Sequence, residues 1–449
     1  MKREEWKSRL GFIWAAVGSA VGLGNIWRFP YVVGENGGAL FVLLYLLCLA
    51  AVAFPILVAE ILIGRKAKSS PFQSFKSLGR SRIWGLGGKL TIVTGFLVSS
   101  FYGVIAGWTL GYLVQAFFGN LTNFTSGAEA VSYFEKVTSS PFWSIGTFFL
   151  LMGCCYWILS SGVKKGIEGA NKVMMPLLMF VLLLLAFRGL LLPGGTKALK
   201  FLFSPDFSQL SGKVVLMALG QAFFSLSLGQ GTMVTYGSYL SQKENVTTTT
   251  LPIALFGIFI SIFAGMAIFS IVFTAGGSVS SGEGLMFETL PVIFSKMHGG
   301  YFFCLLFFGL IFMAGLTSQI SALEPLIAYL VDEKRWKRKR ATLTAVIASF
   351  AVGIPSALSF GPWKEVRFFG KNFFEIVSGG AVNLLIPIGG LLAALFAGWR
   401  WGLKKSMAHL HEGADELLER KPFIESYLRF TIKYLAPLII IIILFDQLI

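Results

Sequence analysis

Long apolar runs separated by short polar segments fill most of this chain. A helix needs about 20 apolar residues to cross the hydrocarbon core of a bilayer. Eleven runs approach or exceed that length, and we expect a membrane-spanning helix in each of them: 10–34, 38–64, 88–118, 142–160, 170–192, 213–240, 250–275, 301–331, 342–360, 373–399 and 425–447. The pattern therefore predicts an all-α integral membrane protein with about eleven transmembrane helices.

Two of these runs are interrupted by small and polar residues. The first contains GSAVGLGNIWRFP at residues 18–30, and the sixth contains SLSLGQG at residues 225–231. Discontinuous helices at corresponding places of two halves are typical of secondary transporters that bind their cargo near the bilayer midplane. We therefore predict a single membrane transport domain, 1–449, built from two inverted five-helix repeats and one added helix. The repeats cover 10–192 and 213–399, and the added helix covers 425–447.

The interruptions need partners for their backbone groups. Unwinding a helix inside lipid leaves carbonyls and amides unpaired, which is costly. Carbonyl and hydroxyl oxygens suit a hard cation such as Na+, and exposed helix N-termini suit a carboxylate. Gly22 and Gly24 could instead only permit close helix packing. Asn25 favours a binding site, because a carboxamide at this depth without a function is costly.

A third polar cluster lies in the eighth run, where AGLTSQ at residues 314–319 places two adjacent hydroxyls beside small residues. Hydroxyls in membrane helices usually bond to carbonyls of their own helix, so this cluster alone is a weak indication of a site.

Composition and charge agree with a membrane protein. Hydrophobic residues make up 55% of the chain and charged residues 13%, whereas about a quarter of the residues are charged in soluble domains. The formal net charge of +16 could indicate nucleic-acid binding, but the basic residues lie in short loops between apolar runs. This positive-inside pattern puts loops 66–89, 164–172, 332–340 and 400–421 in the cytoplasm with the N-terminus, and the C-terminus outside. We expect no nucleic-acid partner, no disulfide and no metal cluster of histidines.

Five motifs together resemble the neurotransmitter:sodium symporter family, particularly its bacterial transporters of hydrophobic amino acids. They are GLGNIWRFP at 22–30, ENGG at 35–38, GWTLG at 107–111, SLSLG at 225–229 and AGLTS at 314–318. The resemblance runs nearly end to end. It implies a symporter in a bacterial inner membrane that couples inward Na+ movement to the uptake of a neutral, hydrophobic or aromatic amino acid by alternating access.

The resemblance also implies ion sites. One sodium site between the first and eighth spans would use carbonyls and hydroxyls of Gly18, Val21, Ala314, Thr317 and Ser318. A second would use Ala20, Asn25 and Ser225 with the substrate carboxylate. Here Gly257 stands where the family has an asparagine or aspartate, so this second site lacks one ligand and the number of sodium ions stays open.

Chloride is a further expected ion. Ser261 matches the position where chloride-dependent relatives have serine and chloride-independent bacterial relatives have an acidic residue. The matching ligands are Tyr45, Gln221, Ser225 and Ser261. These four ligands are neutral donors, and no carboxylate lies among them to compensate the charge of a nearby bound cation. An anion could balance that charge. The alternative is that Ser261 and Tyr45 only bond to neighbouring backbone.

The substrate pocket implied by the resemblance draws on the first, third, sixth and eighth spans. Its residues are Ser19, Ala20, Leu23, Gly24, Val98, Tyr102, Phe224, Ser225, Ser227, Gln230, Ser318 and Ala322. Gly24 leaves room for the carboxylate of an amino acid, and Tyr102 would donate to that carboxylate. Phe224 would cover the pocket, and the small Ala322 leaves space for a bulky side chain. Gln230 replaces an expected apolar residue, so a more polar or extended amino-acid-like solute remains an alternative.

Charged and aromatic residues match the family's gates. Arg28 and Glu375 match an outer ion pair, and the inner gate matches Arg3, Trp6, Tyr239 and Asp332. Gly166 and Pro176 match a motif that lets the fifth helix unwind, because proline lacks a backbone N–H. Glu60 matches a carboxylate that braces the broken sixth span, whereas Glu324 has no assigned role.

Other functions remain to be separated from a symporter. A ligand-gated channel would need a continuous polar path, whereas the polar residues here converge on one region between two gates. A substrate sensor would not need gates at both ends. An enzyme is not expected, since the chain lacks a metalloprotease histidine pair, a G-x-S-x-G elbow and a phosphate-binding loop. We expect a monomer or a weak homo-oligomer in the bilayer.

Overall fold

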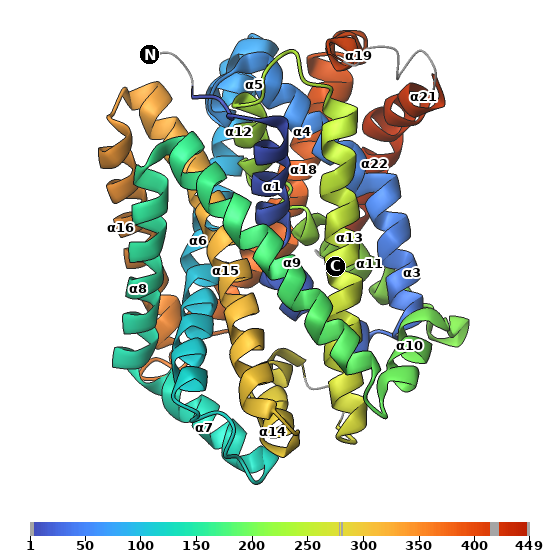
Figure 1. Cartoon of the computed structure of the whole chain (residues 1–449). Coiled ribbons are helices and arrows are strands. Elements are labelled where there is room, and N and C mark those ends of the chain that lie inside the picture. The colour runs from blue at the N-terminus through green and yellow to red at the C-terminus, as the bar shows by residue number, and fades with distance from the viewer. Residues whose placement is uncertain (1–3, 278, 280–281, 414–421, 447–449) are drawn as a thin grey trace.

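The computed structural model describes residues 4–277, 279, 282–413 and 422–446 and consists of helices joined by short loops (Figure 1). Within these residues no strand occurs, and an isolated bridge joins Phe368 to Lys371. The prediction of an all-α membrane protein is therefore confirmed.

Nine helices are long and apolar enough to cross a membrane among the described residues, and α1 with the helix after it forms a tenth span that bends by 51°. The sixth predicted span is divided into α11 and α12, and with this pair every predicted run has its helix. Two spans are thus discontinuous, the first and the sixth, as predicted. The boundaries of the two repeats stay a prediction.

The spans have the following bounds in chain order. They are α1 (Arg9–Ala20), η1 (Gly24–Arg28) and α2 (Phe29–Glu35); α3 (Ala39–Cys48), η2 (Leu49–Ala53) and α4 (Phe54–Ala67); α6 (Arg82–Phe117); α8 (Pro141–Ser160); η3 (Val163–Glu168) and α9 (Gly169–Leu190); α11 (Gly212–Ser225) and α12 (Thr232–Ser238); α13 (Val246–Thr274); α15 (Gly300–Lys334); α16 (Arg338–Leu358); α17 (Phe373–Gly379), η6 (Gly380–Leu385), α18 (Ile386–Leu395) and η7 (Phe396–Arg400); α21 (Pro422–Phe430), η8 (Thr431–Leu435) and α22 (Ala436–Asp446).

Short helices in the loops were not predicted, because they are too short for the hydropathy pattern to separate them from loops. They are α5 (Pro71–Gly79), α7 (Gly127–Ser139), α10 (Gly195–Phe203), η4 (Phe207–Gln209), η5 (Gly282–Leu285), α14 (Thr289–Lys296) and α19 (Leu403–His411).

Several spans contain a wider π-helical turn, and four of these turns are followed by proline. Pro30, Pro55, Pro387 and Pro437 each stand two residues after the last residue of η1, η2, η6 and η8. Proline lacks the N–H that an α-helix would use, and its ring crowds the carbonyl four residues earlier. A wider turn before the proline accommodates both effects and bends the helix locally.

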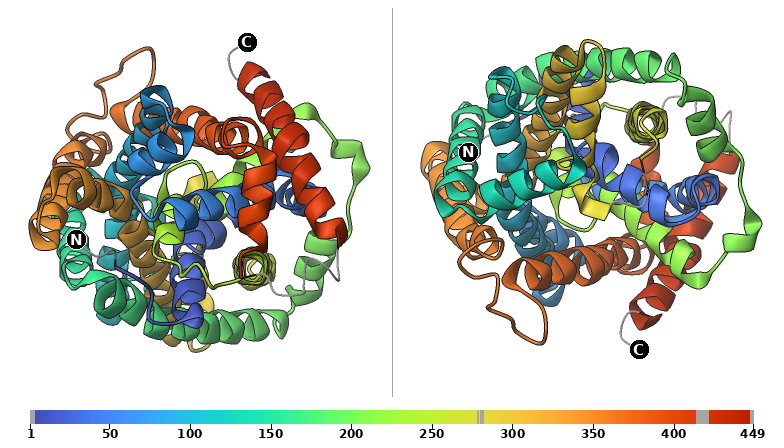
Figure 2. Two further views of the ribbon diagram at one scale, coloured as in Figure 1. Left: turned by 90° about the horizontal axis from the view of Figure 1, so that it is seen from above. Right: turned by 90° about the horizontal axis from the view of Figure 1, so that it is seen from below.

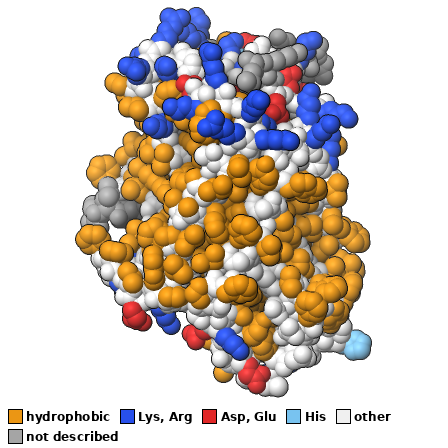
Figure 3. Space-filling view, turned by 90° about the vertical axis from the view of Figure 1, so that its left-hand side faces the viewer, with side chains coloured by type: hydrophobic (Ala, Val, Ile, Leu, Met, Phe, Trp, Pro, Cys, Tyr) orange, Lys and Arg blue, Asp and Glu red, His pale blue; other side chains and the backbone are white. Residues whose placement is uncertain are grey.

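The interrupted spans lie inside the bundle. All seven residues of α12 are buried, and α1 is buried along most of its length. Figure 2 shows α8, α9, α16 and α22 around the outside, and these helices expose large apolar side chains such as Phe142, Trp157 and Phe187. In Figure 3 such side chains form a band between two polar ends, and Lys and Arg gather at the end that carries α5 and α19. We name this the basic end.

A fully buried arginine organises the basic end. Arg65, in the last turn of α4, donates to the carbonyls of Glu244 at 2.5 Å and Glu412 at 2.9 Å and to that of His409. Burial and the adjacent Arg65 guanidinium lower the pKa of His409 to about 4. Neutral His409 can therefore accept from Arg65 Nε at 3.1 Å through Nε2 while Nδ1 donates to Glu412 at 2.7 Å. This cluster fastens α19 to α4.

Two glycines let α4 and α12 pack in close contact. A Cβ added at Gly64 would lie 1.9 Å from the carbonyl oxygen of Val234, and one at Gly237 would lie 2.5 Å from that of Ile61. Backbone cannot yield as a flexible side chain can, so these positions admit no side chain without separating the two helices.

We expect Gly64→Ala to destabilise the protein by about 1–3 kcal/mol through overpacking. Gly146→Ala in α8 is the matched control, because a Cβ there meets nothing within 4 Å and alanine favours a helix. The measurement is the thermal midpoint of the purified protein in detergent. Equal midpoints for the two variants would contradict the close α4–α12 contact.

Candidate functional site

The first interruption follows Ala20, the last residue of α1. Val21 leaves the helical conformation, with φ −93° and ψ 77°. A Cβ at Gly22 would lie 2.3 Å from Ser318 Oγ and 2.7 Å from Tyr102 Oη, so only glycine fits this approach. Leu23 N, freed from the helix, donates to Tyr102 Oη at 3.0 Å.

The second interruption follows α11. Ser227, Gly229 and Gly231 have positive φ angles of 52°, 73° and 75°, which for the two glycines is the reason the sequence needs them. Gly229 N donates to Glu60 Oε1 at 2.8 Å, so Glu60 braces the broken span as expected.

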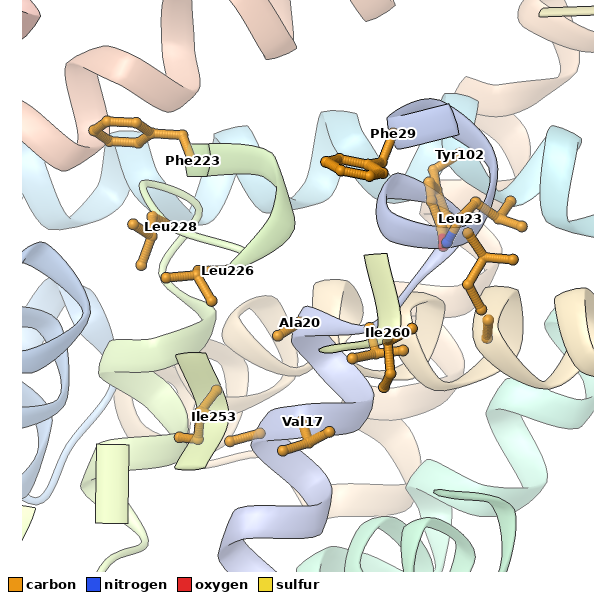
Figure 4. Close-up of a cluster of buried hydrophobic side chains, with 14 of the residues drawn as sticks. Val17, Ala20, Leu23, Phe29, Tyr102, Phe223, Leu226, Leu228, Ile253 and Ile260 are labelled. Carbon is orange, nitrogen blue, oxygen red and sulfur yellow. The ribbon is translucent and has the colours of Figure 1, made fainter. Parts of the chain in front are cut away.

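One hydrogen bond joins the two interruptions, from Ser227 Oγ to the carbonyl of Ser19 at 2.8 Å. Apolar side chains surround both, including Val17 on α1, Leu226 and Leu228 in the second break, and Ile253 on α13 (Figure 4). The unwound backbone is therefore enclosed, and its polar groups must find partners in the protein or in bound ligands.

A small cavity lies between the interruptions, with about 30 Å³ of space open to the centre of a water molecule. Its walls are Ser19, Ala20, Gly22, Gly24, Val98, Tyr102, Phe224, Ser227, Gln230, Ser318 and Ala322. The structure thus brings together all but two of the predicted pocket residues. Leu23 contributes its amide to Tyr102, and Ser225 faces Tyr45 instead. Gly22 was missed, although it stands beside Leu23 in the first motif.

Phe224 closes the cavity on one side. A Cβ at Gly24 would lie 2.4 Å from Phe224 Cδ1, so glycine lets the ring lie against the broken helix. Arg28 Cζ lies 5.6 Å from the centre of the same ring, within cation–π distance. A cavity of this size holds one or two water molecules. A larger occupant therefore needs these walls to move apart.

The predicted sodium ligands between α1 and α15 are in contact. Ser318 Oγ donates to the carbonyls of Gly18 at 3.3 Å and Ser19 at 3.1 Å. Thr317 Oγ1 bonds to the Ala314 carbonyl at 3.1 Å, which is the within-helix bond foreseen as the alternative. Val21 follows directly after the last turn of α1. The structure thus brings Ser318 against the end of α1, and the predicted ligand groups are uncharged.

Asn171 on α9 was not predicted at this place. Its Oδ1 is buried without a hydrogen-bond partner and would lie 2.0 Å from a Cβ at Gly18. Its Nδ2 donates to the Ile167 carbonyl at 2.9 Å. A polar amide within an apolar span was the sequence signal that could have revealed it.

A second group of polar residues lies around Asn25. Asn25 Nδ2 donates to the Gly257 carbonyl at 3.3 Å, whereas Asn25 Oδ1 is buried and unpartnered. The contact agrees with the alignment that put Gly257 at this site. Because glycine has no side chain, Gly257 offers only its backbone carbonyl where an asparagine or aspartate was expected.

Three hydroxyls meet beside this group. Tyr45 Oη donates to Ser225 Oγ at 3.2 Å, and Ser261 Oγ is buried close to Tyr45 without a hydrogen-bond partner. Gln221, the fourth predicted chloride ligand, is engaged elsewhere: Nε2 donates to the Gly24 carbonyl at 2.8 Å, and Oε1 accepts from Arg28 at 2.5 Å.

The predicted outer ion pair is not formed in this conformation. Arg28 Nη1 bonds to Gln221, and no Arg28–Glu375 contact within 4.0 Å occurs among the described residues. Glu375 instead accepts from Asn372 N at 2.8 Å in a capping box that starts α17. The nearest neighbours along the chain therefore satisfy this carboxylate.

The residues predicted for the inner gate lie at the basic end. Trp6 N donates to the Tyr239 carbonyl at 3.2 Å, and Trp6 Nε1 donates to the Tyr236 carbonyl at 3.0 Å. Asp332 Oδ2 accepts from Ser70 N at 2.6 Å. Arg3, the fourth predicted gate residue, lies outside the described residues.

Glu324 is the buried centre of a polar cluster at this end, a position the sequence did not reveal. Arg338 Nη1 and Nη2 donate to its two oxygens at 2.9 and 2.8 Å, and Tyr239 Oη donates to Oε1 at 2.6 Å. Arg338 Nη1 also lies 3.6 Å from Glu4 Oε1. A bidentate pair of this kind is strong and geometrically specific. It links α12, α15 and α16 to the N-terminal segment.

Comparisons with known proteins gave matches along the whole chain. A model of the sodium:neurotransmitter symporter family matches residues 3–133 and 130–449. The uncharacterized sodium-dependent transporter YhdH of Bacillus subtilis is 36% identical over 442 residues, 98% of this chain and 97% of YhdH. An uncharacterized sodium-dependent transporter of Haemophilus influenzae is 33% identical over 459 residues, 100% of this chain and 98% of that protein. The crystal structure of MhsT in complex with L-phenylalanine matches with a TM-score of 0.91 at 42% identity, covering 99% of each chain.

Arg338→Met should destabilise the protein by about 3–5 kcal/mol, because it leaves the Glu324 carboxylate buried without its cation. The double variant Glu324→Gln/Arg338→Met removes both charges and should recover part of that loss. Thermal midpoints in detergent measure the difference. Lys66→Met, which breaks the exposed 3.2 Å pair with Glu412, is the control and should cost less than about 1 kcal/mol. A double variant no more stable than Arg338→Met would refute the buried pair.

Proposed function

Because the chain belongs to the sodium:neurotransmitter symporter family, we propose that it couples inward movement of Na+ to the uptake of a neutral amino acid by alternating access. Membership makes the chain a sodium-dependent transporter and not an enzyme. The observation that carries the finer proposal is the enclosed cavity between two unwound helices, bordered by uncharged oxygens and closed at both ends.

Uncharged ligands suit a coupling ion. Ser318 and Thr317 hydroxyls with the Gly18 and Ala314 carbonyls supply neutral oxygens, so the ion is held weakly enough to leave again. Asn25 Oδ1 and Asn171 Oδ1 are both buried without a partner. Buried polar atoms are rarely left unpaired, and a cation beside them provides a reason for both. These atoms support sodium at each of the two predicted positions.

The cavity lining supports a zwitterion without net charge. None of its eleven lining residues is charged. Tyr102 Oη accepts from Leu23 N and can donate its own proton to a carboxylate, while Val98, Ala322 and Phe224 offer apolar contact. MhsT, which is similar over nearly the whole chain, is described in complex with L-phenylalanine. A hydrophobic or aromatic amino acid therefore fits the proposal best.

Alternating access is supported by closures on both sides. At the basic end a cavity of about 720 Å³ stops at Tyr239, Asp332 and Arg338. At the opposite end a cavity of about 690 Å³ reaches Phe360 and Asn372. The small central cavity has its own walls, which argues against the continuous path of a channel. Sodium-driven accumulation of an amino acid against its gradient would separate a transporter from a channel.

The proposal includes chloride as a second transported or required ion. The hydroxyls of Tyr45, Ser225 and Ser261 face one buried place, Ser261 Oγ lacks a partner, and none of the three groups is acidic. An anion there would offset the charge of a neighbouring cation. Gln221 would have to release Arg28 or Gly24 to contribute, so three hydroxyls are the core of the site.

The location also follows from charge. Lysines and arginines at the basic end support its placement in the cytoplasm of a bacterial inner membrane, with the N-terminus on that side (Figure 3). We propose that the protein works there as a monomer or a weak homo-oligomer.

Thr317→Ala and Ser318→Ala should each raise the sodium concentration for half-maximal uptake by about 10-fold, equivalent to one lost ligand of about 1.4 kcal/mol. Uptake into proteoliposomes at varied sodium measures this. Ser321→Ala is the matched control, because that hydroxyl on the same helix bonds to the Ser318 carbonyl at 2.8 Å. Unchanged sodium dependence in both test variants would refute the α1–α15 site.

Ser261→Glu should remove the chloride requirement, because a fixed carboxylate replaces the anion. Ser261→Gln, of the same size without the charge, should not. Uptake with chloride replaced by gluconate measures both. Chloride-independent uptake by the wild-type protein would overturn the anion site while leaving sodium coupling intact.

A further inference from the structure

Gln230 places an unpaired carboxamide at the central cavity. The side chain lines the cavity and is 6% exposed, and its Oε1 is buried without a hydrogen-bond partner. Gln230 was noted in the sequence as a polar residue where the family has an apolar one. An amide enclosed in this way is retained only when something satisfies it.

The backbone holds the carboxamide in place. Gln230 lies between Gly229 and Gly231, both with positive φ. Its carbonyl oxygen would lie 2.7 Å from a Cβ at Gly95, so the segment packs directly on α6. On the other side a Cβ at Gly229 would lie 2.0 Å from the Ile386 carbonyl of α18. Held between α6 and α18, Gln230 cannot turn its amide away by a shift of the segment.

The Gln230 backbone lies about two turns of α6 away from Tyr102. Gly95, beside the Gln230 backbone, precedes Tyr102 by seven residues on the continuous helix α6, which is roughly 10 Å along the helix axis. Val98 lies between them and Ala322 beside Gly95. A substrate whose carboxylate meets Tyr102 therefore extends its side chain past Val98 and Ala322 toward Gln230.

We propose that Gln230 is a specificity-determining residue that selects neutral amino acids whose long side chain ends in a hydrogen-bonding group. This rests on the proposed function. Tyrosine fits, since its phenol can donate to Oε1 or accept from Nε2, whereas phenylalanine leaves the amide unpaired. Sites built to hydrogen-bond a substrate group discriminate strongly against analogues that lack it, because their own polar group is then left unsatisfied.

The test compares tyrosine with phenylalanine, which differ by one hydroxyl. Each competes for sodium-driven uptake in proteoliposomes of the full-length protein. We expect wild type to prefer tyrosine by about 10-fold or more in half-inhibitory concentration. Gln230→Met keeps an unbranched side chain of similar length without the amide. Its tyrosine preference should fall by about 10-fold, with tyrosine weakened and phenylalanine strengthened.

Two controls make the outcome decisive. Val98→Ala changes the apolar wall and should alter both affinities together, so that the ratio stays within about 3-fold of wild type. The second control measures how much each amino acid raises the thermal midpoint of the detergent-purified wild type. This measurement does not depend on whether a variant folds. Phenylalanine that stabilises wild type as much as tyrosine does would overturn the inference, as would an unchanged ratio in Gln230→Met.

The result also separates this inference from the function on which it rests. Sodium-driven uptake of amino acids with a ratio independent of residue 230 would refute the role of Gln230 alone. No sodium-driven uptake of any amino acid by wild type would refute the proposed function itself.

Discussion

The structure depends on the pairing of backbone groups where two helices unwind inside the membrane. Lipid offers no hydrogen bonds, so a break in a span persists only if protein or cargo supplies partners. Some partners come from the protein itself: Tyr102 receives Leu23 N, Glu60 receives Gly229 N, and Ser227 bonds to the Ser19 carbonyl across the two breaks. The remaining oxygens face neutral side chains. The two breaks therefore form one unit in which structural pairing and cargo binding share the same backbone.

Charge is distributed unequally between the site and the gates. The cavity is lined by neutral residues, whereas the basic end is closed by Glu324, Arg338 and Glu4 with their aromatic neighbours. A strongly charged site would hold an ion too tightly for release, while a gate benefits from a strong bidentate pair that has two discrete states, made and broken. The residues predicted for the outer gate are paired differently: Arg28 lies over the Phe224 ring and bonds to Gln221, and Glu375 is satisfied by its own helix cap.

Unpaired buried atoms indicate where cargo is expected. Asn25 Oδ1, Asn171 Oδ1, Ser261 Oγ and Gln230 Oε1 come from four different spans and lack partners. The first three border the proposed ion sites and the fourth borders the substrate cavity. Such atoms would be expensive in a protein that only packed its helices. Their positions support the proposed binding site over a close-packed, glycine-rich core, the alternative that the sequence left open for Gly22 and Gly24.

The sequence by itself determined the spans and the two interruptions, because hydropathy and small or polar residues act locally along the chain. Most of the cavity lining came from the resemblance of its motifs to a known family. The same resemblance also revealed the Glu60 brace. Only the tertiary structure decided which side chains meet across helices. Glu324 pairs with Arg338 on the next span, and Glu375 bonds to Asn372 rather than to Arg28. Asn171 on α9 lies against Gly18. The physical reason is that a local pattern fixes which face of a helix is polar or small, whereas a pairing depends on how separate helices approach, tilt and exclude water.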